Sequence, residues 1–500
     1  MESQIHFESG RTGCLTCSFQ GKYLHSKYNP EAEGERFAES VRADFSPLCV
    51  FVLEPALSYC APFLRKRFPA AVLCAIRFCG VFSDYDAHWD FVFHLKKNHG
   101  EAALSPLSED LFSALGEEKL ISSLAFDWNP SKQAFSEESL ESWAELKKAI
   151  LKARDVIGTR AYFSKRWLKN SLIFAANVQN AVIAENGNSP IVIAASGPSL
   201  AASIPFIKKF RDTFFLIAVS SAFMPLSHGG ITPDAVISSD GGFWAKKHLD
   251  FAGSDSTATF ALEAESAVPK KILRREKILP LVYADGLEKD FLNAIGCPYM
   301  ISERNGTVAG TALTFALALT SGNIYLCGLD QAPAAAFQHT QPNALETDNA
   351  RKDFHLKNAE TRITSSRFNS AATLEIYRNW FAANSGIFAE RVFRLSDNFP
   401  YEYGLGKIRE SNWTDFEKTE KKSGKPRFAQ KQIAAKITGR KKIIIETLRS
   451  MAGTEKFKNE VFPMDTILIK RELSDEKKAE LKSKSDEKIS ALIKECEKLL

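Results

Sequence analysis

Residues 191–200, Ile-Val-Ile-Ala-Ala-Ser-Gly-Pro-Ser-Leu, constrain the fold more than any other segment of the chain. The β-branched run at its start predicts a buried strand, and Gly197-Pro198-Ser199 predicts a tight turn into a helix. A strand, a turn of small residues and a helix in this order are typical of an open α/β sheet, in which the helix directs its N-terminal N–H groups at an anion. Two interpretations fit this turn equally: a site for a phosphate or nucleotide, and an ordinary connection.

Strand-like runs alternate with helical stretches throughout residues 190–410. Strands are expected over residues 191–195, 214–220, 235–239, 259–264, 279–284 and 324–328, and helices over 201–210 and 308–320. This alternation predicts an α/β fold with a central Rossmann-like, mostly parallel sheet, whose ligand lies at the carboxyl ends of the central strands. The sequence has neither a Gly-x-Gly-x-x-Gly fingerprint nor a Gly-x-x-x-x-Gly-Lys-Ser/Thr loop, which argues against a standard NAD site and a P-loop.

Three further segments flank this central domain, residues 190–410. Residues 1–135 predict an N-terminal α/β module, and residues 136–189 predict connecting helices. Residues 411–500 combine a basic linker with a helical tail rich in Lys and Glu. The basic run is either a solvated surface or a docking site for an acidic partner. Few aromatic residues are interleaved with it, so a nucleic-acid partner is not expected.

The composition is that of an ordinary globular protein: 45% of the 500 residues are hydrophobic and 25% are charged. The net charge of +5 is too small for this length to indicate a nucleic-acid partner by itself. Polar residues follow Met1, and charged residues interrupt the most apolar stretch, so we expect neither a signal peptide nor membrane association. Cys14-x-x-Cys17 lacks the second pair that a zinc site needs. We expect a cytoplasmic protein with reduced thiols and no metal; the alternative is a redox role for this pair.

Small and polar residues gather where the expected central strands end. The candidate binding residues are Ser196, Gly197, Pro198, Ser199, Ser220, Ser221, Asp240, Ser302, Thr307, Thr311 and Asp330. Hydroxyls and backbone N–H groups at these positions suit a phosphate, a ribose or a sugar, although Ser and Asp there can also cap helices or stabilise turns. His339 follows in a polar loop, where an imidazole can act as a general base near neutral pH. The alternative for His339 is an ordinary surface histidine.

Several motifs occur in one order along the chain. They are Tyr23-Leu-His-Ser-Lys-Tyr-Asn-Pro30, Arg166-Trp-Leu-Lys-Asn170, Gly197-Pro-Ser-Leu200, Gly230-Ile-Thr-Pro-Asp234 followed by Asp240, the helix start from Gly306 to Thr311, and Ile324-Tyr-Leu-Cys-Gly-Leu-Asp330 followed by His339. Over residues 20–410 this order resembles the motility accessory factor (Maf) family of flagellin glycosyltransferases. The resemblance implies transfer of a nonulosonic, sialic acid-like sugar from a CMP-activated donor to Ser or Thr hydroxyls of flagellin.

The resemblance also implies roles for the candidate residues. His339 would be the general base, and Gly197, Ser199, Thr307 and Thr311 would hold the departing CMP phosphate. Ser220, Ser221 and Asp240 would contact the nucleotide or the sugar. The central domain of the family is similar to sialyltransferases that need no metal, so no cofactor is implied beyond the CMP-sugar, which is a substrate.

The sequence departs from the family pattern at three places. Ala195 replaces a usual Gly, Ser220 replaces a common Asn, and residues 53–59 lack the expected glycines, which leaves open whether the N-terminal module binds a ligand. Two other functions fit. The central domain also resembles archaeal hydroxymethylpterin pyrophosphokinases, which would use ATP with Mg²⁺ held by Asp240 and Asp330. A flagellin-binding chaperone without catalysis is the third.

Overall fold

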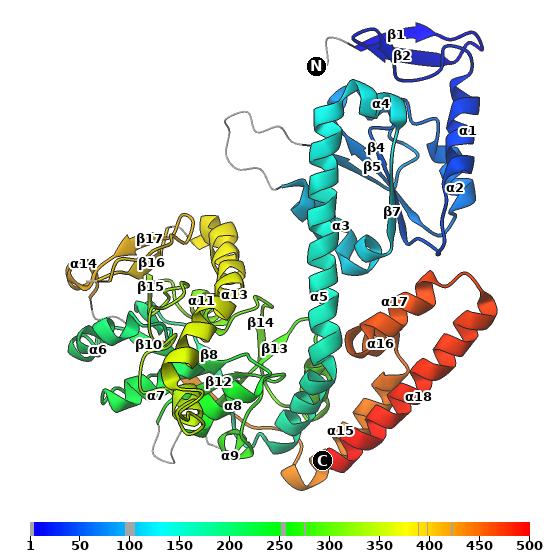
Figure 1. Ribbon diagram of the computed structural model, residues 1–500. Helices are drawn as coiled ribbons and strands as arrows, with labels where there is room; N and C mark the ends of the chain where they lie inside the picture. The colour runs from blue at the N-terminus through cyan, green and yellow to red at the C-terminus, as the bar shows by residue number, and fades with distance from the viewer. Residues whose placement is uncertain are drawn as a thin grey trace. The chain divides into compact units, whose positions relative to one another are not determined.

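The computed structural model describes residues 5–95, 106–251, 257–274, 277–388, 390–397, 399–421 and 424–500. These residues form two compact units (Figure 1). Unit 1 comprises Met1–Ser164 with Glu455–Ala491, and unit 2 comprises Lys165–Thr454 with Leu492–Leu500. Helices α5 (Ser136–Asn177) and α18 (Asp475–Leu499) each contribute residues to both units.

Unit 1 contains a parallel sheet of order β6-β5-β4-β7 and a small antiparallel sheet of order β1-β2-β3. The parallel strands are β4 (Cys49–Leu53), β5 (Val72–Arg77), β6 (Phe91–His94) and β7 (Ser123–Asp127), and the antiparallel strands are β1 (Ile5–Ser9), β2 (Leu15–Phe19) and β3 (Lys22–Tyr23). Helices α1 (Pro30–Ser40), α2 (Ala61–Arg67), η2 (Gly80–Tyr85), α3 (Leu107–Ile121), α4 (Asn129–Ala134), α16 (Glu455–Val461) and α17 (Pro463–Arg471) complete the unit.

Strand β4 is apolar on both faces because helices cover both of them. Val50 and Val52 belong to a buried cluster that includes residues of α1 and α2, whereas Phe51 and Leu53 belong to a second cluster that includes residues of α3 and α5. The sequence of a central strand in a parallel sheet is accordingly a continuous hydrophobic run. Helix α1 begins as the sequence predicts, since Asn29 accepts a hydrogen bond from the Ala32 amide at 3.0 Å.

Unit 2 is built on an 11-stranded sheet of order β17-β16-β15-β9-β10-β11-β12-β13-β8-β18, with β14 beside β13. The strands are β8 (Ala181–Glu185), β9 (Ile191–Ala194), β10 (Phe215–Val219), β11 (Ala235–Ser238), β12 (Thr259–Glu263), β13 (Ile278–Tyr283), β14 (Met300–Ser302), β15 (Ile324–Cys327), β16 (Val392–Leu395), β17 (Arg409–Ser411) and β18 (Arg427–Lys431). Neighbouring strands are parallel except for the antiparallel pair of β18 with β8. This arrangement confirms the predicted α/β fold, and each strand expected between residues 190 and 410 is present.

The helices of unit 2 follow the strands in the manner of an open α/β sheet. They are α6 (Leu200–Lys209), α7 (Ser220–His228), α8 (Phe243–Asp250), α9 (Lys270–Leu273), α10 (Glu288–Ala294), α11 (Val308–Leu319), α12 (Ala344–Ala350), α13 (Ala359–Phe388), α14 (Trp413–Thr419) and α15 (Ile437–Ala452). Among the described residues, no helix combines the length and the apolar character that crossing a bilayer demands.

The order of the strands reverses at β9. The chain runs from β9 to β10 and onward to β13 on one side, and later adds β15, β16 and β17 on the other side. Ile193 of β9 therefore lies in register between Ile217 of β10 and Leu326 of β15. In such sheets the ligand crevice lies at the carboxyl ends of the strands where the order reverses. This rule predicts that the segments following β9 and β15 border the ligand crevice.

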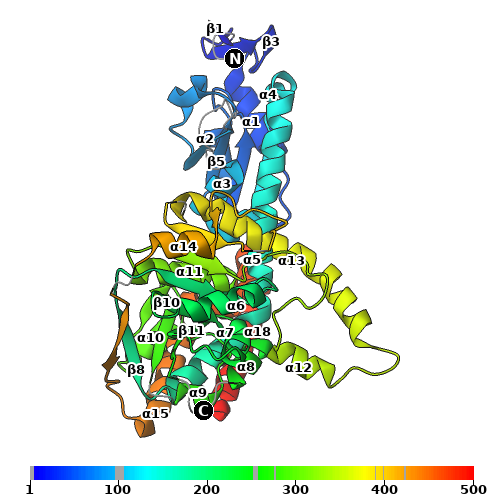
Figure 2. The same cartoon turned by 90° about the vertical axis from the view of Figure 1, so that its left-hand side faces the viewer.

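Helix α13 has two different halves. Phe381 and Phe388, in its C-terminal half, are buried in the core of unit 2. Its N-terminal half and α12 project from that unit (Figure 2). The projecting segment follows the loop that carries His339, so it borders the candidate site.

Candidate functional site

The turn after β9 is closed by a carboxylate of the protein itself. The Ser199 amide donates to Asp330 Oδ2 at 2.9 Å, and the Ser199 hydroxyl donates to Asp330 Oδ1. The Gly197 amide donates to the Gly328 carbonyl at 2.8 Å. Asp330 follows β15 and thus occupies the place at the start of α6 where the sequence suggested an external anion. Pro198 lies in the turn before α6, which begins at Leu200.

Gly197 is required by this internal packing. A Cβ at this position would lie 2.6 Å from the Gly328 carbonyl oxygen and 2.8 Å from Asp330 Oδ2. Burial raises the pKa of Asp330, while the hydrogen bonds from Ser199 act in the opposite direction. The Gly197–Asp330 contact therefore joins the ends of β9 and β15 and fills the corner between them.

A second group of contacts lies at the ends of β9 and β10. Ser221 donates its hydroxyl to the Ser196 hydroxyl at 2.7 Å. The loop after β15 crosses this pair: the Thr340 amide donates to the Ser196 carbonyl at 2.8 Å, and Asn343 donates to the Ser221 carbonyl at 3.2 Å. Ser220 is buried as the first residue of α7. The structure thus brings Ser196 and Ser221 together, with His339 next in sequence to Thr340.

A third group lies at the end of β11 and the start of α11. Thr311 Oγ1 lies 3.0 Å from Ser239 Oγ and 2.9 Å from Asn305 Oδ1. Thr307 is the N-cap of α11 and accepts a hydrogen bond from the Gly310 amide at 2.8 Å. Because β9, β10 and β11 are adjacent and parallel, this group and the Ser196–Ser221 pair lie on the same edge of the sheet.

Asp240 and Ser302 lie at the margins of this edge. The Asp240 side chain is exposed and accepts a hydrogen bond from the Gly242 amide at 2.7 Å. Burial, and then the charge of Asp240, raise the pKa of Tyr377 on α13, which places this helix near the carboxylate. Ser302 ends β14, beyond β12 and β13, and lies next to Glu263 rather than next to the other candidate residues.

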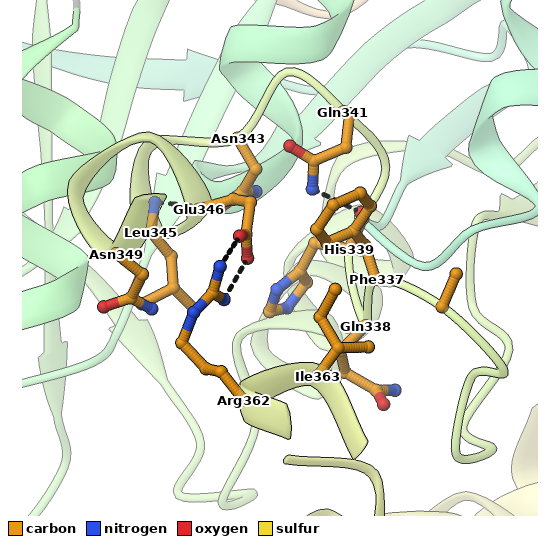
Figure 3. Close-up of a pocket in the computed structure, with 11 residues that line it drawn as sticks. Phe337, Gln338, His339, Gln341, Asn343, Leu345, Glu346, Asn349, Arg362 and Ile363 are labelled. Atoms are coloured by element: carbon orange, nitrogen blue, oxygen red, sulfur yellow. Dashed lines mark hydrogen bonds and ion pairs between the residues drawn. The ribbon is translucent and has the colours of Figure 1, made fainter. Parts of the chain in front are cut away.

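His339 lines a small pocket together with the connection from the loop to α13 (Figure 3). Burial lowers the pKa of His339. Its ring centroid lies 6.4 Å from that of His248, whose pKa is lowered to about 4 by burial and by His339. Both imidazoles are consequently neutral at pH 7. A neutral imidazole can accept a proton, which a general base must do.

Arg362 is committed to neighbouring carboxylates in the same pocket. It donates to both oxygens of Glu346, at 2.5 and 3.0 Å, and to both oxygens of Asp353, each at 2.8 Å. Figure 3 shows the guanidinium facing the Glu346 carboxylate, with the His339 imidazole beside this pair. The ion pairs fasten α12 to the start of α13. They also leave Arg362 poorly suited to neutralise a ligand phosphate.

Four polar residues outside the predicted set belong to this edge of the sheet: Ser239, Asn305, Thr340 and Asn343. Each lies within four residues of a predicted one, so proximity in the sequence was the available signal. Within the described ranges, no group of three or more His, Cys, Asp or Glu side chains is arranged to hold a metal ion. The edge is therefore built mainly from hydroxyl and amide groups, with the Asp240 carboxylate at its margin.

Comparison with solved structures defines the class of fold. The chain is similar to the structure of MAf glycosyltransferase from Magnetospirillum magneticum AMB-1, with a TM-score of 0.58. The match covers 99% of this chain and 91% of that chain at 14% identity. The architecture is thus that of the MAf glycosyltransferase, and the similarity in fold that the motifs implied is confirmed.

The central region has a more specific match. Residues 165–335 match the family model described as 6-hydroxymethylpterin diphosphokinase MptE-like, in agreement with the second similarity expected for this domain. Two uncharacterized proteins of Treponema pallidum (strain Nichols) are also similar. One is 30% identical over 286 residues, which is 56% of this chain and 62% of the relative; the other is 31% identical over 116 residues, 22% of this chain and 53% of the relative. The chain therefore matches less than two thirds of the length of either relative.

Proposed function

We propose that the chain is a glycosyltransferase that moves a nonulosonic sugar from a CMP-activated donor to a Ser or Thr hydroxyl of flagellin. The carrying observation is that the loop with the partly buried His339 is fastened at the ends of β9 and β10, where the neighbouring Thr340 amide donates to the Ser196 carbonyl and Ser196 pairs with Ser221. The similarity in fold to the MAf glycosyltransferase supports the same class of reaction. We propose that this reaction takes place in the cytoplasm.

The proposed reaction is a single displacement at the anomeric carbon. The acceptor hydroxyl forms a bond to this carbon as the bond to the CMP phosphate oxygen breaks, and the hydroxyl proton passes to His339. The phosphate leaves with the bonding electron pair, so it needs hydrogen-bond donors around it. The bonds and protons of this transfer balance with three components: the CMP-sugar donor, the acceptor hydroxyl and the general base.

We assign the phosphate to the start of α11 rather than to the start of α6. Asp330 already accepts hydrogen bonds at α6, and a second anion there would be repelled. Helix α11 starts at the same edge of the sheet, and Gly306, which precedes Thr307, has open space where a side chain would lie. The N-terminal end of a helix favours an anion. Thr307 and Thr311 then flank the phosphate, while Ser221 and Asp240 lie toward the nucleoside or the sugar.

Donor binding requires a local rearrangement. The pocket beside His339 has a volume of about 70 Å³. Small-molecule sites usually have about 300–1,000 Å³. We propose that the loop carrying His339 and the projecting α12 shift to admit the donor, because this segment forms most of the wall of the pocket.

The test uses the purified chain, a CMP-activated nonulosonic acid and flagellin. We expect His339→Ala to lower the rate of transfer at least 100-fold, the lower end of the contribution of a general base. CMP binding, measured by calorimetry, should stay within a factor of about three. His355→Ala is the matched control, because His355 is exposed in the connection between α12 and α13. Normal transfer by the His339 variant would remove this residue from the mechanism.

The match to the MptE-like family favours one other activity, the transfer of diphosphate from ATP to a hydroxymethylpterin-like alcohol. Thermal unfolding distinguishes the candidates, because a ligand of the folded state raises the melting temperature. Stabilisation by CMP alone supports the glycosyltransferase. Stabilisation by ATP with Mg²⁺ alone supports the diphosphokinase, and stabilisation by flagellin but by neither nucleotide supports a chaperone.

A further inference from the structure

Unit 1 contains a cavity that the proposed function does not use. It lies beyond the carboxyl ends of β4 and β5 and has a volume of about 490 Å³. Tyr59 and Phe63, which follow β4, and Tyr85 and His88, which follow β5, contribute to its walls. This volume is within the range of small-molecule sites, about 300–1,000 Å³. The place is also the one where an open parallel sheet binds ligands.

The loop after β4 is held in an unusual conformation. Glu54, Ala56 and Ser58 have φ angles of 41°, 43° and 61°, in the left-handed region that residues other than glycine rarely adopt. Fully buried Arg77 holds the loop by donating hydrogen bonds to Glu54 Oε1 at 2.9 Å, to the Ala56 carbonyl at 2.8 Å and to Ser58 Oγ at 2.9 Å. Strained backbone of this kind persists only where its surroundings stabilise it, and it concentrates at binding sites.

Arg77 also fixes the opposite wall of the cavity. Its Nε donates to Asp86 Oδ1 at 2.9 Å, which ties the segment after β5 to the loop after β4. The Trp89 indole N–H donates to Ser58 Oγ at 3.0 Å and adds a second tie. The two walls therefore have fixed positions relative to each other. The cavity is preformed, so binding of a ligand loses little conformational entropy of the protein.

The charges around the cavity identify the kind of ligand. Its lining includes two exposed carboxylates, Glu31 on α1 and Asp84 in η2, and neither Lys nor Arg. The buried guanidinium of Arg77 is already paired with Glu54 and Asp86. An anionic ligand such as a phosphate would find neither a Lys nor an Arg side chain in the lining, and the loop after β4 has no glycine to let a phosphate approach its backbone.

Aromatic rings next to carboxylates suit a cation. The face of an aromatic ring attracts an ammonium or guanidinium group, and a carboxylate adds a charge-assisted hydrogen bond. The Phe63 ring already faces Lys66 of α2, 5.6 Å from its centre, so we assign the ligand to the rings of Tyr59 and Tyr85. We propose that the cavity binds an organic cation, an ammonium or guanidinium group carried by a small molecule or by a Lys or Arg side chain of a polypeptide.

Calorimetry on the full chain tests this proposal with two probes, agmatine and the peptide Gly-Arg-Gly, and with glutarate as the anionic comparison. We expect both cations to bind and glutarate not to bind. Tighter binding of agmatine assigns the site to small molecules, and tighter binding of the peptide assigns it to a polypeptide. Binding should weaken as the salt concentration rises. Absence of binding by both cations at millimolar concentration would overturn the proposal.

The decisive variant is Glu31→Gln combined with Asp84→Asn, which removes two charges from exposed side chains without changing their size. We expect the affinity for both cations to fall at least tenfold. Glu39→Gln is the matched control, because Glu39 is exposed on the same helix and is not part of the cavity lining. Unchanged affinity in the double variant would also reject the site. CMP binding by unit 2 should be normal in these variants, so failure here is distinct from failure of the proposed transferase.

Discussion

At the scale of single residues, the most instructive pair is Gly197 and Asp330. The sequence places Gly197 between a strand and a helix, an arrangement that fits a phosphate site and an ordinary connection equally. In the structure the space beside Gly197 is filled by the Gly328 carbonyl and the Asp330 carboxylate. The contact joins residues more than 130 positions apart, so no local pattern contains it.

This packing predicts the effect of Gly197→Ala. The added methyl would lie 2.6 Å from a backbone oxygen that cannot rotate away. We expect the free energy of unfolding to fall by about 1–3 kcal/mol, the usual cost of overpacking. Denaturant unfolding measures this change. Gly439→Ala is the control, since a Cβ at this position in α15 has open space and alanine favours a helix, so the control should be neutral or more stable. Equal stability of both variants would contradict the structure.

Glu263 gives a second prediction at this scale. It is fully buried at the end of β12, and burial raises its pKa from an ordinary 4.5 to about 8. Between these values the unfolded chain releases the proton while the folded chain keeps it, so stability falls as the pH rises from about 4.5 to about 8 and is constant above that. Glutamine carries no such proton. We therefore expect Glu263→Gln to gain stability relative to the parent by about 1.4 kcal/mol per pH unit in this window.

Urea unfolding at pH 5, 6.5 and 8 measures the difference for Glu263→Gln. Glu303→Gln is the matched control, because it makes the same substitution at an exposed glutamate. A constant difference between Glu263→Gln and the parent across the three pH values would show that the carboxyl group is not held protonated.

At the scale of elements, the local sequence was sufficient to predict the buried strands but not the strands at the edge of the sheet. The runs that became β9, β10, β11 and β15 are apolar and rich in β-branched residues, so burial alone predicts them, and Ser196 and Ser221 follow two of these runs at one edge of the sheet. Strand β18 comes from the basic run expected to be a linker. Arg427, Gln430 and Lys431 of this strand are charged or polar, and the strand pairs with β8 at the edge of the sheet, where Lys and Arg also protect against further pairing.

The connection between α12 and α13 gives the prediction that belongs to this scale. Arg362 is the shared partner of Glu346 on α12 and Asp353 beyond it. We expect Arg362→Met to free α12 from α13, so that hydrogen exchange over residues 344–362 becomes several times faster while global unfolding is unchanged. Lys357→Met is the matched control, because Lys357 is exposed in the same connection. Unaltered exchange in the Arg362 variant would show that other contacts hold the segment.

At the scale of the whole molecule, two parallel sheets occur in one chain, and each presents the carboxyl ends of its strands as a place for a ligand. The chemistry of the two places is opposite. The edge of unit 2 offers hydroxyls, backbone amides and a helix N-terminus, which suit a phosphate, whereas the cavity of unit 1 offers carboxylates and aromatic rings, which suit a cation.

This contrast predicts that each ligand protects a different unit from hydrogen exchange. We expect CMP to slow exchange in unit 2, over residues 303–311 and 336–346, and to leave residues 54–63 and 80–88 of unit 1 unchanged. Agmatine should give the reverse pattern. Exchange measured by mass spectrometry with each ligand alone and with both together checks the prediction. Protection of the same residues by both ligands would contradict the assignment of two separate sites, because a pocket built for one charge disfavours the opposite charge.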